Sequence, residues 1–78
     1  MDWTTHLQED LRDELADCTK YANMAKSATG ADRQILHDMA KEEYQHAKHI
    51  CHLMKEHGIQ SDMNEDEVFA KAMHMLYE

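Results

Sequence analysis

Apolar residues recur at intervals of three and four along two stretches of the chain, as they do on one face of an α-helix. The first stretch predicts a helix over about 5–28, with an apolar face of Trp3, Leu7, Leu11, Cys18, Tyr21, Ala25 and Ala28. The second predicts a helix over about 32–57, with Leu36, Met39, Ala47, Ile50 and Met54. A shorter pattern predicts a third helix over about 65–77, so the chain reads as all-α.

The two glycines divide this pattern. Gly30 and Gly58 follow the first and second helix in the position where glycine commonly ends a helix. A connection as short as 29–31 makes the first two helices an antiparallel hairpin. We therefore predict one domain over 1–78, with a hairpin at 1–58, a linker at 59–64 and the third helix at 65–78. A hairpin with one apolar face cannot bury that face alone, so we expect two copies to form a four-helix bundle.

Three polar residues interrupt the apolar faces: Glu14 in the first helix, and Glu43 and His46 in the second. At 100° per residue, Glu43 and His46 lie about 60° apart on one side of their helix. Glu14 precedes Gly30 by 16 residues, while Glu43 and His46 follow it by 13 and 16. At about 1.5 Å per residue, Glu14 is level with His46 and within one turn of Glu43. The three side chains are expected to point into the core and converge there.

A charged carboxylate in a core is costly unless it is paired or binds a metal. Glu-x-x-His on one helix with a Glu on its neighbour is half the ligand set of a di-metal four-helix bundle. Two copies related by a two-fold axis would supply four carboxylates and two imidazoles for two metals. Such ligands suit iron, with manganese as an alternative, at one ion per chain. The alternative without metal is a buried Glu–His hydrogen-bonded cluster.

Composition narrows the class of protein. The chain has 78 residues and a formal net charge of −8, which disfavours nucleic acid as a partner and favours cations such as Fe²⁺. It has no Pro, two Gly and two Cys, which suits helices and is too few cysteines for a disulfide framework. Without a long apolar run we expect no membrane span, and we expect a cytoplasmic protein. So small a domain usually needs a metal or a partner subunit.

The segments 11–21 (LRDELADCTKY) and 39–47 (MAKEEYQHA) resemble the half-ferritins of the ferritin-like superfamily. They look most like encapsulated ferritins, the encapsulin-associated ferritins whose ferroxidase centre forms between subunits. The rubrerythrin-like proteins share the Glu-Glu-x-x-His-Ala pattern. The resemblance covers about residues 7–57 and implies a homodimer, higher homo-oligomers and enclosure by an encapsulin nanocompartment.

The resemblance also implies roles for single residues. Glu14, Glu43 and His46 would be iron ligands, with Glu43 bridging the two irons, and Tyr21 would stand beside the iron. The implied activity is a ferroxidase that oxidises Fe²⁺ with dioxygen or peroxide, for iron storage and detoxification. Two alternatives stay open: a rubrerythrin-like peroxide reductase, and a non-catalytic helical module for assembly or for binding a metal such as zinc.

Overall fold

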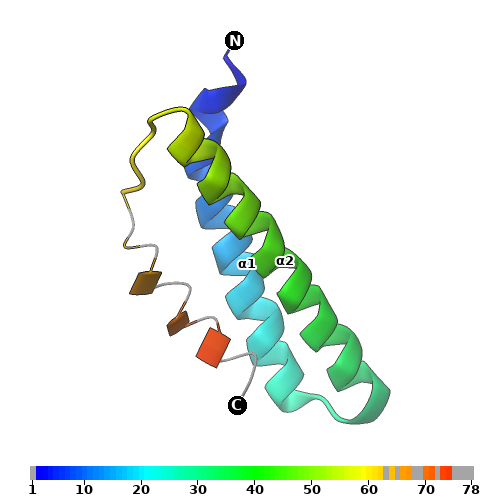
Figure 1. Cartoon of the computed structure of the whole chain (residues 1–78). Helices are drawn as coiled ribbons and strands as arrows, with labels where there is room; N and C mark the ends of the chain where they lie inside the picture. The colour runs from blue at the N-terminus through cyan, green and yellow to red at the C-terminus, as the bar shows by residue number, and fades with distance from the viewer. Residues whose placement is uncertain (1, 63, 65, 68–69, 72, 75–78) are drawn as a thin grey trace.

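The chain folds as an antiparallel two-helix hairpin (Figure 1). The computed structural model describes residues 2–62, 64, 66–67, 70–71 and 73–74. A short 3₁₀-helix η1 (Trp3–His6) leads into α1 (Leu7–Ser27), and α2 (Gly30–Glu56) returns beside it. The predicted all-α fold and the hairpin are confirmed, and both long helices begin and end within two residues of the predicted bounds.

The turn between the helices differs in detail from the prediction. Helix α1 ends at Ser27 with Ala28 as its C-cap, and both Ala28 and Thr29 have extended backbone. Gly30 has φ +59°, in the left-handed region, but it is the first residue of α2 and not a cap of α1. The two extended residues reverse the chain, and the glycine then sets the direction in which α2 starts. The prediction that Gly30 ends the first helix is therefore wrong, because Gly30 already belongs to α2.

Gly58 ends α2 as predicted. It has φ +66°, its N–H donates to the carbonyl of Lys55 at 3.2 Å, and the N–H of Ile59 donates to Met54 at 2.8 Å. This pair of bonds is the Schellman motif, which glycine favours because it has no Cβ. Ile59 also packs against the cluster that contains Met54, so the turn brings the following segment back onto the hairpin.

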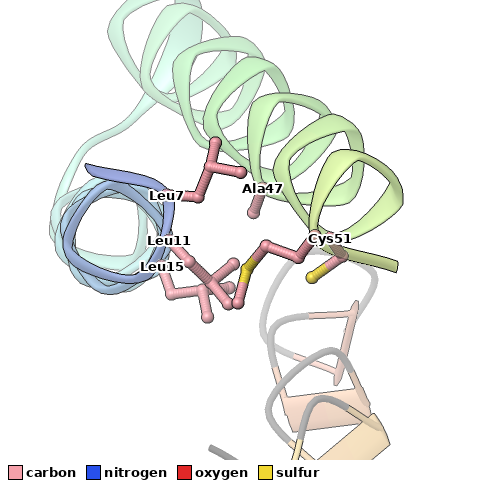
Figure 2. Close-up of a cluster of buried hydrophobic side chains, with 6 residues drawn as sticks. Leu7, Leu11, Leu15, Ala47 and Cys51 are labelled. Atoms are coloured by element: carbon pink, nitrogen blue, oxygen red, sulfur yellow. The ribbon is translucent and has the colours of Figure 1, made fainter. Parts of the chain in front are cut away.

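A narrow seam of buried side chains joins the two helices, and Figure 2 shows one of the clusters in it. From α1 and α2 respectively it comprises Leu7, Leu11, Leu15, Cys18, Ala22 and Ala25, and Ala40, Ala47, Cys51 and Met54. The sequence pattern missed Leu15, Ala22, Ala40 and Cys51. Conversely Tyr21, Leu36, Met39 and Ile50 are only half-buried, and Trp3 is 52% exposed. The predicted apolar face of each helix is thus rotated about the helix axis, towards one side, relative to the face that is buried.

This rotation defines two sides of the hairpin. On α1, Glu14 lies about 60° from Leu11 in one direction around the helix, while Gln8 and Arg12 lie about 60–100° in the other. The "Glu14 side" comprises Glu14 and Tyr21 of α1 with Met39, Glu43, His46 and Ile50 of α2. The "Asp62 side" comprises Gln8 and Arg12 of α1, Tyr44 and Cys51 of α2, and the segment 59–62, in which Asp62 contacts Gln8 and Arg12.

Part of the expected third helix lies outside the described residues, so that element stays a prediction. Within the described residues, the side chain of Asn64 accepts a hydrogen bond from the Glu67 N–H at 3.2 Å. This is the contact of a helix N-cap, and it lies where the third helix was expected to begin. In the described part of the chain, neither helix is both long and apolar enough to cross a membrane.

Candidate metal centre

The structure brings together the three residues that the sequence selected as metal ligands. Glu14 comes from α1, and Glu43 and His46 come from successive turns of α2. Each offers one ligand atom, and these atoms all lie within 4.8 Å of one another. Their convergence follows from the short turn, which sets the two helices side by side at matched heights. Their role as metal ligands stays a prediction.

One oxygen of this group lacks a donor. Glu14 Oε2 is buried, and no described group donates a hydrogen bond to it. Nδ1 of His46 lies 3.5 Å from this oxygen, which is too long for a good hydrogen bond. A buried carboxylate oxygen without a partner is unfavourable, and either a proton or a cation between the side chains would satisfy it.

The two carboxyl groups affect each other's charge. A hydrogen bond with Glu14, then burial, then the negative charge of Glu14 raise the pKa of Glu43 from 4.5 to about 7. His46 opposes this shift, and Asp17 adds to it. Two carboxyl groups this close tend to share one proton. A divalent cation can replace that proton and neutralise both groups, so the arrangement suits metal binding.

The site lies at the edge of the hairpin interface and not in its centre. The side chain of His46 is 56% exposed and that of Glu14 27% exposed. Glu14 and His46 are therefore not enclosed within the single chain, and their burial in the core of a two-copy bundle stays a prediction. The physical reason is that each helix has one neighbour in a hairpin, so only the seam is covered. The Glu14 side, which carries the site, lies beside that seam.

Cys18 lies on the seam close to the site. Its side chain is fully buried, and burial followed by the charge of Glu43 raises the pKa of its thiol. The thiol therefore stays protonated, which makes it a poor nucleophile and a poor metal ligand. Cys18 and Cys51 both remain thiols and belong to different buried clusters.

Tyr21 is half-buried and packs against the cluster of Cys18, Ala22 and Ala40, with Lys20 Nζ 4.9 Å from the centre of its ring. It lies two turns after Glu14 on the same side of α1, and its role beside a metal stays a prediction. Sequence reasoning missed Tyr44, which packs on the same cluster from α2. Its spacing of four residues from Ala40 was the available signal.

Asp17 was also passed over as a neighbour of the site. It is half-buried, it pairs with Lys20 at 3.6 Å, and its charge reaches Glu43. Its position three residues after Glu14, one helical turn along, was the signal in the sequence that it lies near the site. The remaining histidines form no second group: within the described residues, Glu14, Glu43 and His46 are the one set of three suited to a metal.

Comparison with known proteins finds no significantly similar protein. No protein-family model matches the chain, and no curated protein or solved structure is significantly similar to it. The likeness to half-ferritins thus rests on the motifs within residues 7–57.

Proposed function

We propose that this chain is a half-ferritin that binds iron through Glu14, Glu43 and His46 and oxidises Fe²⁺ at an interface between two copies. One observation carries the proposal. Three ligand atoms from two helices lie within 4.8 Å of one another, and one of them is a buried carboxylate oxygen without a donor. A divalent cation between the three side chains would satisfy that oxygen and neutralise both carboxylates.

The ligand chemistry favours a hard or borderline divalent ion. Two carboxylates and one imidazole suit iron or manganese, whereas sites selective for zinc or copper often use thiolate. Cys18 is not a member of the ligand group, so the set contains oxygen and nitrogen alone. Two carboxylates carry two negative charges, which one divalent ion per chain neutralises. Burying the site in an interface then becomes favourable.

The Glu14 side has the composition of an interface. Apolar residues of this side lie to both ends of the site, at Tyr21, Met39 and Ile50. Met24 and Ile35 lie near the turn on its outer flank, about 140° from Leu11 and about 120° from Ala47 around their helices, and they are 46% and 57% exposed. Glu43 lies at the midpoint of α2. A two-fold axis through the middle of this side would therefore bring the two ligand sets together. The partner would cover the exposed imidazole and complete the coordination of each ion, which three ligands leave open.

The carboxylates and the imidazole have different roles at the proposed site. Glu14 and Glu43 release their shared proton and carry the charge that holds the ion, and His46 contributes a neutral nitrogen. Carboxylates are hard donors, so they stabilise Fe³⁺ over Fe²⁺ and favour the oxidised product. Two Fe²⁺ ions would give one electron each, which with two protons reduces dioxygen to hydrogen peroxide, or hydrogen peroxide to two waters. A pair of ions held by two chains matches this two-electron demand.

The proposal extends to the cellular role. A hairpin dimer has no cavity for storing mineral, so storage would require an enclosing compartment. The resemblance points to an encapsulin shell in the cytoplasm, with iron storage and detoxification as the purpose.

The test is an anaerobic Fe²⁺ titration of metal-free protein, followed by an air pulse that is read optically at the ferric band. We expect saturation at about one iron per chain and rapid oxidation. Glu43→Ala should remove both, whereas the matched variant Glu42→Ala changes an exposed neighbour and should keep both. Wild-type rates in Glu43→Ala would reject the ferroxidase assignment. Tight zinc binding without iron turnover would favour the structural module.

A further inference from the structure

The segment that follows α2 crosses the open end of the hairpin and contacts α1. Ile59 packs against the buried cluster of Leu7, Leu11, Leu15, Ala47, Cys51 and Met54. Three residues later, the carboxylate of Asp62 accepts a hydrogen bond from the Gln8 side chain and pairs with Arg12. These contacts attach the residues 59–62, here called the strap, to both helices.

The strap lies on one side only. Gln8 and Arg12 project from α1 away from Glu14, as the helical geometry of the fold requires. Cys51 projects from α2 towards the same side as the strap and is 6% exposed. Glu43 lies at a similar angle on the opposite side of the seam and is less buried. The strap therefore lies over the end of the Asp62 side near Gln8 and Arg12, on the opposite side of the seam from Glu14.

Electrostatics give the attachment a defined position. Residues 7–17 of α1 contain five acidic side chains and one cation, Arg12. An acidic segment brought against this stretch is repelled except where Arg12 lies. The pair is exposed, so it adds little stability, but it fixes where the strap docks on α1.

We propose that the strap is a latch, closed by Asp62 on Arg12 and Gln8, which shields Cys51 and restricts association of the chain to the Glu14 side. A hairpin with both sides open could pair through each of them, and two different contacts per chain produce open-ended assemblies. With the Asp62 side covered, one self-complementary contact remains and the assembly closes. The statement about association rests on the dimer proposed above, whereas the shielding of Cys51 does not.

The test uses charge reversal at the latch. Asp62→Lys and Arg12→Glu should each undock the strap, and the double variant Arg12→Glu/Asp62→Lys should dock it again. Asp66→Lys and Arg33→Glu are matched controls, because they change the charge equally at exposed positions outside the latch. Two readouts are compared: the rate of Cys51 alkylation relative to Cys18, followed by peptide mass, and the mass of the protein with and without Mn²⁺ by light scattering. Circular dichroism checks that each variant stays helical.

We expect each single reversal to raise Cys51 alkylation roughly fivefold, which is the scale of a lost exposed ion pair. Fully buried Cys18 should stay unreactive. The Mn²⁺-loaded single variants should be heavier than the Mn²⁺-loaded wild type, and the double variant should restore both values. Unchanged alkylation, or faster alkylation without heavier assemblies, would overturn the latch.

The two proposals fail in distinguishable ways. If wild-type protein binds no Mn²⁺ or stays monomeric with it, the dimeric metal site is wrong. The statement about association then falls with the dimer, and the shielding of Cys51 is tested by alkylation alone, which should still be faster in the single variants. If Mn²⁺ gives the same dimer in wild type and in all variants, the metal site stands and the latch is rejected.

Discussion

The two sides of the hairpin differ in what covers them. Among the described residues, the Asp62 side carries none of the candidate ligands, and the segment 59–62 packs over its end near Gln8 and Arg12. The Glu14 side carries the whole ligand group together with exposed apolar residues such as Met24 and Ile35. If burial of apolar surface alone decided where the segment 59–62 docks, it would lie on the Glu14 side, which has the exposed apolar residues. In the proposed dimer, a second copy would cover the Glu14 side.

The seam between the two sides should give the largest effect, because both sides depend on it. Leu11 is fully buried in that seam. Leu11→Ala should destabilise the hairpin by about 2–5 kcal/mol, as the lost contacts and the new cavity both contribute. Chemical unfolding of metal-free protein followed by circular dichroism measures this. A cost below about 0.5 kcal/mol would show that the seam does not hold the helices together.

Removing a ligand should break the Glu14 side and leave the Asp62 side intact. Glu14→Ala should weaken Mn²⁺ binding about 100-fold, because it deletes one of three ligands and leaves Glu43 without its partner. Calorimetric titration gives the affinity. Asp13→Ala, at the exposed neighbouring position, is the control and should bind as wild type does. Equal affinities in the two variants would remove Glu14 from the site.

The ligand group could be predicted from the sequence, whereas the exact set of buried seam residues could not. Counting from Gly30 placed Glu14 level with His46, because helix rise is constant and the turn is short. The same pattern could not separate the buried seam from the half-buried stripe beside it. Tyr21, Met39 and Ile50 continue a helical spacing as well as Leu15, Ala22 and Ala40 do, so hydrophobicity assigned the wrong set to the core.

The docking of the strap on α1 could not be predicted from the sequence either, for a different reason. Its attachment depends on the contacts of Asp62 with Gln8 and Arg12, which lie far from it in the chain, and no periodic pattern indicates them. The C-cap at Gly58 could be predicted because a Schellman turn is local. The exposure of His46 could not be predicted, since it depends on whether a second copy is present.

A charge on the apolar part of the Glu14 side should have the next largest effect. Ile35 is 57% exposed, so Ile35→Asp should leave the single chain folded. In a dimer the aspartate would be buried or displaced, and we expect metal-dependent dimerisation to weaken about tenfold. Sedimentation of Mn²⁺-loaded protein measures it. Arg33→Asp introduces the same residue towards the Asp62 side and should have less effect. Equal effects would show that the two sides are equivalent.

The pH dependence of stability should give the smallest effect. The pKa of Glu43 is raised from 4.5 to about 7, so the folded metal-free protein holds a proton that the unfolded chain loses. This contribution is fully present below pH 4.5 and is lost as the pH rises through about 7. Because the site is partly exposed to solvent, we expect only ~1 kcal/mol.

The measurement compares thermal unfolding of chelator-treated wild type and Glu43→Gln at pH 5 and pH 8. The wild type should lose more stability than the variant between these values, since glutamine does not titrate. Identical pH profiles would show that Glu43 and Glu14 share no proton.

Native mass spectrometry during an anaerobic Fe²⁺ titration tests the central claim most directly, since it reads chains and ions in one particle. The dimeric centre on the Glu14 side predicts a species of two chains with two irons, formed from metal-free chains and absent in Glu43→Ala. One iron on a single chain without dimerisation, or a dimer whose formation ignores iron and Glu43, would contradict the claim.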